Sequence, residues 1–152
     1  MDNSVEKVIF IGEYAHTIDA KKRLAIPARL RGALGGKAVL TRGLDMCLSI
    51  YPVMAWEKLV AKLGDLPVGK GDTRSFIRLI LSGAQEVELD ALGRILIPDY
   101  LKNYAGLKKS VTLAGVYDRL EVWDTERWAQ YRSSAEKNTD AIAEKLGELG
   151  VY

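Results

Sequence analysis

Two five-residue motifs carry the residue types in this chain that are best suited to chemistry. Each begins with an aspartate and ends with an arginine four residues later, Asp19 with Arg23 and Asp90 with Arg94. An aspartate before a turn can accept backbone N–H bonds and pair with the arginine, which would be a purely structural use of the motif. Arginine is also the side chain that reads guanine O6 and N7 in the DNA major groove. The motif by itself leaves both uses open.

The surroundings of the first motif favour the DNA interpretation. Its turn contains three consecutive cations, Lys21, Lys22 and Arg23, where a stabilising ion pair needs only one. Residues 19–42 hold seven basic side chains against one acid, although the formal charge of the whole chain is only +2. Arg23 and Arg94 are therefore predicted to read bases. Contacts to DNA phosphates are assigned to Lys21, Lys22, Arg29 and Arg31.

A glycine-rich stretch gives a weaker signal. Residues 64–71 spell Gly-x4-Gly-Lys, but Gly71 stands where a nucleotide-binding loop needs Ser or Thr. A predicted helix, and not a strand, also precedes the stretch. We interpret it as the linker between two halves of the chain and expect no cofactor and no small-molecule substrate.

Residues that bind metals or form catalytic pairs are scarce. His16 is the single histidine and Cys47 the single cysteine, so the usual zinc ligands are missing and any nucleophile–histidine pair would depend on His16. We expect His16 to pack or to lie at the surface. Glu86 and Glu88, with the aspartate of the second motif, are expected to form a solvated strand edge. The sequence therefore predicts no metal site, no catalytic residues and no enzyme.

An internal repeat organises the chain around the two motifs. Residues 18–27 align with 89–98 at an offset of 71, and both contain Asp-x-x-x-Arg, three apolar residues and proline. Farther along, Gly43 matches Gly115 at an offset of 72, which predicts one inserted residue near 108–109. We divide the chain into a first repeat over 13–55, a helical connection and linker over 56–83, a second repeat over 84–127 and a C-terminal helix over 128–152.

Each repeat is predicted to contain a strand, a turn, a second strand, a short helix and a hairpin. Polar and apolar residues alternate before each motif, and an apolar strand follows it. These strands end at Pro27 and Pro98, which suit the first position of a helix. Further helices are expected from Pro52, from an Asp72 N-cap and from an Asp124 N-cap. We expect the three tryptophans, Trp56, Trp123 and Trp128, to lie in the core.

Size constrains how the repeats combine. A unit of about 45 residues buries too little surface to be stable alone without disulfides or metal. The two copies are therefore expected to pack against each other about a pseudo-two-fold axis and to display both motifs symmetrically. The predicted fold class is α+β, with a mainly β core and packing helices.

The lone Cys47 also bears on location, because it cannot form an internal disulfide and so favours a reducing, intracellular compartment. The apolar run at residues 8–11 is too short for a signal-peptide core or a membrane span. We expect a cytoplasmic protein with no membrane partner.

These features together resemble the MraZ family, whose members contain two AbrB-like swapped-hairpin half-barrels. The matching segments are the paired Asp-x-x-x-Arg turns with the Ile-Pro that follows each, Leu48-Ser49-Ile50-Tyr51-Pro52, Leu81-Ser82-Gly83-Ala84 and Glu121-Val122-Trp123-Asp124. The resemblance implies an intramolecular pseudo-two-fold barrel, with Asp19, Arg23, Asp90 and Arg94 at the DNA. One position departs from the pattern: Lys22 stands where the family often has glycine, as at Gly93. If the turn needs a positive φ, Lys22 costs about 1 kcal/mol.

The resemblance also implies a function. It suggests a bacterial, nucleoid-associated transcriptional regulator that binds short direct repeats in double-stranded promoter DNA, usually as a repressor. The expected targets lie upstream of the division and cell-wall gene cluster, including the gene of the protein itself, and the expected assembly is a homo-oligomeric ring. The alternative is an antitoxin-like interaction module that binds a protein partner through residues 135–152.

Overall fold

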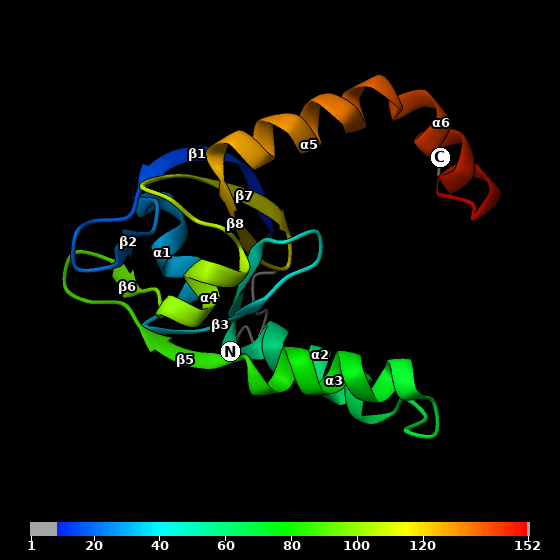
Figure 1. The fold of residues 1–152 in the computed structure, drawn as a ribbon, viewed down its shortest axis with the longest axis horizontal. Helices are drawn as coiled ribbons and strands as arrows, with labels where there is room; N and C mark the ends of the chain where they lie inside the picture. The colour runs from blue at the N-terminus through cyan, green and yellow to red at the C-terminus, as the bar shows by residue number, and fades with distance from the viewer. Residues whose placement is uncertain (1–8, 152) are drawn as a thin grey trace, which may run out of the picture.

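The computed structural model describes residues 9–151 (Figure 1). Val8, the first residue of the apolar run at 8–11, lies outside the described residues. The first repeat provides β1 (Phe10–Thr17), β2 (Arg23–Ala25), α1 (Ala28–Leu34), β3 (Lys37–Arg42) and β4 (Leu48–Pro52). Helices α2 (Val53–Gly64) and α3 (Gly71–Ser82) follow. The second repeat provides β5 (Gln85–Glu88), β6 (Arg94–Leu96), α4 (Asp99–Tyr104), β7 (Ser110–Tyr117) and β8 (Leu120–Asp124). Helices α5 (Thr125–Lys137) and α6 (Thr139–Glu148) come last. The predicted order of elements within each repeat is confirmed.

The strands of the two repeats are interleaved. Six of them form an antiparallel sheet in the order β1-β7-β8-β4-β3-β5, while β2 and β6 form a two-stranded ribbon. β1 of the first repeat pairs with β7 of the second, and β5 of the second pairs with β3 of the first. Because neither repeat completes a sheet alone, the two copies share one α+β fold, as their size predicts.

The strand register reveals the pseudo-two-fold relationship. Leu24 pairs with Ile95 at the centre of the ribbon, and these residues are equivalent in the two repeats. Ser49 pairs with Glu121 between β4 and β8, and these residues are equivalent as well. A two-fold axis that relates the repeats therefore passes through both pairs. It places the two Asp–Arg motifs symmetrically on either side of the ribbon.

The pairing corrects one part of the repeat alignment. Arg42 pairs with Leu48, and Gly115 pairs with Leu120. Since Leu48 and Leu120 are equivalent at an offset of 72, Gly115 corresponds to Arg42, and the predicted match to Gly43 is wrong by one position. The offset within β3 and β7 is 73, so two residues, and not one, are inserted before β7. The hairpin of the first repeat is one residue longer in compensation.

The ribbon lies beside the edges of the six-stranded sheet. An isolated bridge between Ile18 and Leu24 connects the end of β1 to β2. β1 and β5 remain at opposite ends of the strand order. The expected closure into a swapped-hairpin barrel therefore stays a prediction.

One hydrophobic core joins the inner faces of both sheets with α1 and α4. Equivalent positions of the two repeats contribute in pairs, for example Leu24 with Ile95. Fully burying one such side chain stabilises a protein by roughly 1.5–3 kcal/mol, so the shared core is the main force that holds the repeats together. Its fully buried members include Leu24, Ile26, Leu40, Leu48, Ile50, Ile95, Ile97, Leu101, Leu113 and Leu120.

Three prolines lie at helix starts, but at the N-cap and not at the first helical position. Pro27, Pro52 and Pro98 are the N-cap residues of α1, α2 and α4, with ψ values of 134°, 149° and 152°. Each lies one position before the first helical residue. The ring still suits the site, because its fixed φ fits an extended N-cap as well as the first turn.

The two predicted aspartate caps have different outcomes. Asp124 caps α5 as predicted, by accepting a hydrogen bond from the backbone N–H of Arg127 at 3.2 Å. Asp72 does not cap α3, because that helix begins one residue earlier, at Gly71, and its N-cap is Lys70. The Asp72 carboxylate lies instead in the first turn, where the helix dipole favours a negative charge.

Aromatic pairs attach α2 and α5 to the sheet. The ring centroids of Tyr51 and Trp56 lie 5.8 Å apart, and those of Trp123 and Trp128 lie 5.3 Å apart. Trp123 is buried, but Trp56 and Trp128 are half-buried and none of the three belongs to the main core cluster. The prediction that the tryptophans lie in the core is therefore confirmed for Trp123, which is buried on the sheet face opposite the main cluster. It is wrong for Trp56 and Trp128, because each lies on a helix that packs on the outside of the sheet and leaves part of the ring exposed.

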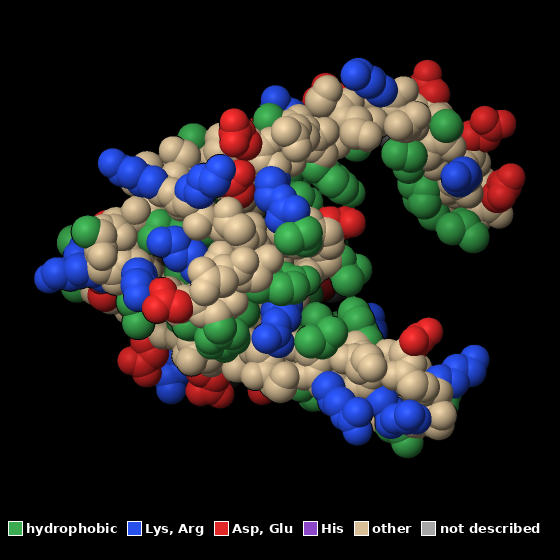
Figure 2. Space-filling view, viewed as in Figure 1, with side chains coloured by type: hydrophobic (Ala, Val, Ile, Leu, Met, Phe, Trp, Pro, Cys, Tyr) green, Lys and Arg blue, Asp and Glu red, His purple; other side chains and the backbone are tan. Residues whose placement is uncertain are grey.

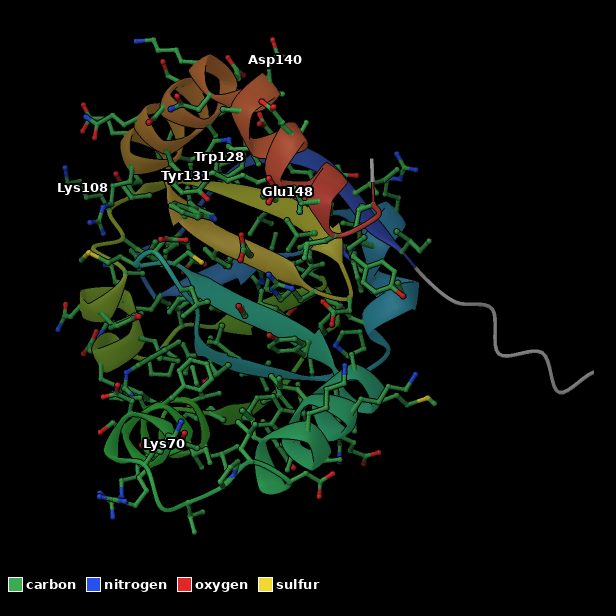
Figure 3. The ribbon with its side chains drawn as sticks, turned by 90° about the vertical axis from the view of Figure 1, so that its right-hand side faces the viewer. Lys70, Lys108, Trp128, Tyr131, Asp140 and Glu148 are labelled. Carbon is green, nitrogen blue, oxygen red and sulfur yellow. The ribbon has the colours of Figure 1, made fainter. Side chains whose placement is uncertain are left out.

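The helices after each repeat form two arms. Figure 1 shows α2–α3 and α5–α6 extending from the sheet on the side away from the ribbon, and Figure 3 shows Trp128 and Tyr131 where α5 crosses the sheet. The sequence predicts one C-terminal helix over 128–152, but a break at Asn138 divides this segment into α5 and α6. Within residues 9–151, no helix combines the length and the apolar character that a bilayer crossing demands.

Candidate nucleic-acid interface

The first motif forms a tight turn around its aspartate. Asp19 Oδ1 accepts hydrogen bonds from the backbone N–H groups of Lys21 and Arg23, both at 2.9 Å. Its Oδ2 accepts a bond from Arg23 Nε, also at 2.9 Å. One carboxylate therefore organises the turn and orients the arginine that follows it.

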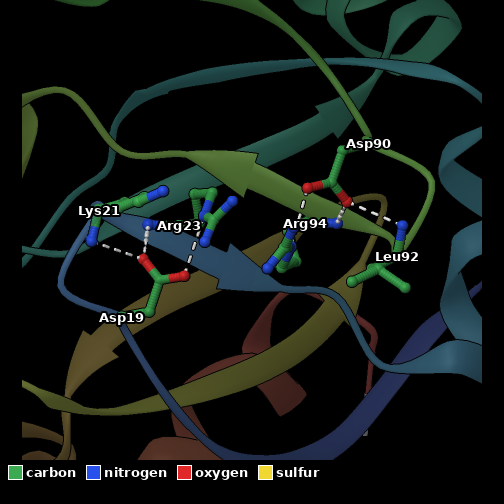
Figure 4. A network of polar contacts seen from close by, with 6 residues as sticks. All are labelled: Asp19, Lys21, Arg23, Asp90, Leu92 and Arg94. Carbon is green, nitrogen blue, oxygen red and sulfur yellow. Dashed lines mark hydrogen bonds and ion pairs between the residues drawn. The ribbon is translucent and has the colours of Figure 1, made fainter.

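The second motif repeats this geometry almost atom for atom. Asp90 Oδ1 accepts hydrogen bonds from the N–H groups of Leu92 and Arg94 at 2.9 Å, and Oδ2 accepts one from Arg94 Nε at 2.8 Å. Figure 4 shows the two networks side by side on β2 and β6. The structural use of the motif is thus present in both copies.

The same hydrogen bonds keep the aspartates ionised. The backbone N–H of Arg23 is the main cause that holds the pKa of Asp19 below its ordinary value, and the Arg23 guanidinium acts in the same direction. The backbone N–H of Arg94 is likewise the main cause that lowers the pKa of Asp90. Both ion pairs therefore persist at neutral pH.

Each arginine keeps part of its guanidinium available. Among the described residues, the hydrogen bonds of Arg23 and Arg94 use only the Nε atom of the side chain. About a third of the Arg23 side chain and a quarter of the Arg94 side chain are exposed. The terminal Nη groups are thus free to donate to a ligand, while the Nε bond limits how far the side chain can move.

Cross-repeat hydrogen bonds hold the two turns next to each other. The backbone N–H of Ile26 donates to the carbonyl of Gly93, and the N–H of Ile97 donates to the carbonyl of Lys22. These bonds are related by the pseudo-two-fold axis. Each turn is therefore fixed by the strand end of the other repeat.

Lys22 adopts the backbone conformation that its glycine counterpart predicts. Its φ is 63°, compared with 74° at Gly93. The left-handed region costs a residue with a side chain about 1 kcal/mol. The Lys22 side chain turns to α4, where Nζ lies 2.7 Å from an oxygen of Asp99.

The other residues assigned to DNA phosphates have different environments. Lys21 and Arg29 are exposed. Arg31 is half-buried, donates from Nε to the carbonyl of Ile26 at 2.9 Å, and lies so close to Gly93 that a Cβ there would overlap it. Lys21 and Arg29 are therefore free at the surface, whereas Lys22 and Arg31 already have partners within the fold.

Two further cations lie beside the first turn. An open groove of about 550 Å³ is lined by residues 17–20 together with Lys102 of α4 and Lys109 of the following loop. Sequence reasoning did not assign these lysines to the site, although the mildly basic region after the second motif signalled them. They come from the second repeat because the repeats are interleaved. Figure 2 shows basic side chains gathered around this end of the molecule.

The glycine-rich stretch and the acidic strand edge lie outside this interface. The 64–71 stretch connects two helices, and two of its carbonyls, those of Val68 and Gly69, accept bonds from Arg74. Glu88 lies on the edge strand β5 near Lys37. Within the part of the chain that the structure describes, no three His, Cys, Asp or Glu side chains are grouped as metal ligands.

His16 and Cys47 are both part of the packing. His16 is half-buried on β1, and burial, with the nearby charge of Arg31, lowers its pKa. Cys47 is fully buried, and burial raises the pKa of its thiol. Neither side chain has the setting of a reactive group.

Two interleaved repeats that display matched Asp–Arg turns on one exposed ribbon define a tandem-repeat protein of the α+β class. A family model described as "MraZ protein, putative antitoxin-like" matches residues 9–79 and again 80–148. The chain is 50% identical to "Transcriptional regulator MraZ" of Clostridium beijerinckii, over 94% of this chain and 100% of the relative. It is 48% identical to the protein of the same name from Acetivibrio thermocellus, with the same coverage. The chain therefore belongs to the MraZ family, which makes it a transcriptional regulator and not an enzyme.

Proposed function

We propose that this regulator binds promoter DNA through the β2–β6 ribbon and its two turns, with Arg23 and Arg94 as the base-reading side chains. The observation that carries the proposal is that both guanidiniums lie on one exposed face, each oriented by an aspartate through Nε. A two-stranded ribbon fits the major groove of B-DNA, and the terminal nitrogens of arginine match guanine O6 and N7.

Most of the basic side chains around the two turns lie near the first turn. Lys21, Lys22, Lys102 and Lys109 all lie close to the first turn, and they suit contacts to phosphates that set the position of the protein on the duplex. Arg31 of α1 extends this basic region to the second turn, where it lies against Gly93, and Arg29 is exposed on the same helix. Only a few phosphates are within reach of a single chain.

Few contacts per chain favour an assembly. Several copies that bind neighbouring DNA repeats act at high effective concentration, so weak individual contacts combine into strong binding. We therefore propose a homo-oligomeric ring on short direct repeats, in a cytoplasmic protein associated with the nucleoid. Its proposed targets are the division and cell-wall gene cluster and its own gene, with repression as the outcome.

The test is retardation of a DNA fragment from upstream of its own gene. The Arg23→Ala/Arg94→Ala double variant should lose binding by about 5- to 150-fold per arginine, since one bidentate base contact contributes roughly 1–3 kcal/mol. The Arg23→Lys/Arg94→Lys variant keeps the positive charges but loses the planar guanidiniums that donate two parallel hydrogen bonds to one guanine. It should therefore also lose sequence preference. Arg74→Ala/Arg78→Ala, which removes two charges from α3, is the matched control.

Two results would contradict the proposal, one for the DNA-reading arginines and one for the assembly. Full affinity of the Arg23→Ala/Arg94→Ala variant at moderate salt would overturn the proposal. Light scattering tests the assembly, and a monomeric mass at micromolar concentration would contradict the ring.

An antitoxin-like interaction module is the second candidate. It is favoured by exposed apolar side chains at this end of the chain, Ile142 of α6, which is 45% accessible, and its C-cap residue Leu149, which is 76% accessible. A protein partner that is retained by the full chain and lost on deletion of residues 135–152, without any DNA binding, would support it over the first proposal.

A further inference from the structure

The exposed face of the β2–β6 ribbon alternates basic and apolar side chains. Arg23 pairs across the ribbon with Leu96, and Ala25 pairs with Arg94, while Leu24 and Ile95 between them point into the core. Leu96 is 57% exposed although it lies in a strand. Each base-reading arginine of the proposed function therefore has one apolar neighbour on the opposite strand, a large one beside Arg23 and a small one beside Arg94.

The tips of the two turns also differ, because one carries a basic and the other an apolar side chain. Lys21 and Leu92 occupy equivalent positions, and each donates its backbone N–H to the aspartate of its own turn at 2.9 Å. Leu92 is 61% exposed and is shown next to Arg94 in Figure 4. The turn geometry thus holds an apolar side chain beside Arg94 and a cation beside Arg23.

Isolated exposed leucines are common on protein surfaces and need no explanation. Leu96 differs because the ribbon register places it on the same face as both guanidiniums, and Leu92 differs because it lies in the Asp90 turn that orients Arg94. Neither leucine belongs to the core cluster. In the major groove, the apolar group that marks a base pair is the C5-methyl of thymine. A leucine beside an arginine can therefore read a thymine next to a guanine.

We propose that Leu92 and Leu96 are specificity-determining residues that contact thymine methyl groups next to the guanines read by Arg94 and Arg23. This inference rests on the proposed DNA binding. Ala25 occupies the position that is symmetry-related to Leu96, and Lys21 the position related to Leu92, so the two halves of the face are unequal. The protein therefore recognises a site with a direction, and a palindrome would leave one half of the face unmatched.

The experiment begins with duplexes selected from a random pool by the full-length protein. In the tightest duplex, each thymine is replaced singly by deoxyuridine, which removes only the methyl group. Wild type should bind about fourfold more weakly at two of these positions, the factor expected for one buried methyl at each. Leu96→Ala should be insensitive at one of them and Leu92→Ala at the other.

Leu79→Ala is the matched control, because Leu79 is 54% exposed on α3, far from the ribbon, and this variant should keep the wild-type uracil pattern. If uracil has the same effect on wild type and on both leucine variants, while Arg23→Ala/Arg94→Ala still abolishes binding, the inference fails and the proposed function stands. Selected sequences with two identical, symmetric halves would overturn the directional reading. If wild type selects no duplex, both proposals fail.

Discussion

Lys22 and Gly93 are equivalent residues of the two turns and share a left-handed backbone, with φ values of 63° and 74°. The two positions differ in what surrounds them. Lys22 has room for its side chain and pairs with Asp99, whereas a Cβ at Gly93 would overlap Arg31 Nε. The left-handed conformation therefore accepts a side chain in the first repeat, whereas in the second repeat a side chain would displace Arg31.

Gly93→Ala is expected to destabilise the protein by about 1–3 kcal/mol, because the new methyl group strains the backbone and displaces Arg31. Gly35→Ala is the matched control: its φ is also 74°, but no atom lies within 4 Å of the added carbon. Urea unfolding should show the larger loss for Gly93→Ala. The difference should shrink in an Arg31→Ala background, and equal losses in the wild-type background would show that Arg31 yields freely.

Gly115→Ala should destabilise the chain by at least about 2 kcal/mol, because the added carbon would lie 2.5–2.7 Å from backbone atoms of Ile11. β1 must then move away from β7, and the hydrogen bonds between the repeats weaken. Gly36→Ala, which meets no atom within 4 Å, is the control. Equal unfolding midpoints for the two variants would contradict the close approach of the strands.

His16 gives the protein a pH-dependent stability. Burial is the main cause that lowers its pKa from 6.5, and the charge of Arg31 adds to it. The native state therefore resists protonation below pH 6.5, while the unfolded chain takes up the proton. The contribution of His16 to the free energy of unfolding is therefore fully present above pH 6.5, and it decreases as the pH drops toward the pKa of the native state. Urea unfolding between pH 7.5 and 5 should show the fall, and His16→Gln should lack this part of it.

The titration of the single histidine can be followed directly by NMR. Arg31→Ala should raise the pKa of His16 but leave it below 6.5, because burial remains the larger cause. Arg29→Ala, on the same helix but exposed, is the control and should leave the titration unchanged. A native pKa at or above 6.5 in the unmodified protein would contradict the burial of the imidazole.

Asp99→Asn should strengthen DNA binding, provided that the ribbon faces DNA as proposed. The change removes a negative charge near the first turn and releases Lys22 Nζ, which lies 2.7 Å from Asp99. One additional phosphate contact makes the slope of log K against log salt steeper by about 0.9. Asp72→Asn on α3 is the charge-matched control. An unchanged slope for Asp99→Asn would show that Lys22 does not reach the duplex.

Much of the site could be predicted from the sequence, because its parts are local. The Asp19 and Asp90 turns form from five consecutive residues, and the offset of 71 showed that the turn at Lys22 must match the one at Gly93. The repeat likewise predicted a shared core, since one copy is too small to bury it. The match of Gly43 to Gly115 failed because the two glycines accommodate different neighbours, the Cys47 sulfur and the Ile11 backbone.

The sequence by itself determined the two motifs, the order of elements around them and the basic character of the first turn, since these depend on neighbouring residues. Only the tertiary structure decided which side chains surround each turn. The exchange of strands between repeats brings Lys102 and Lys109 to the first turn and Arg31 to the second, and the ribbon register places Leu96 opposite Arg23. These contacts join residues about 60 or more positions apart, and they arise from burying one core between two halves that cannot fold separately.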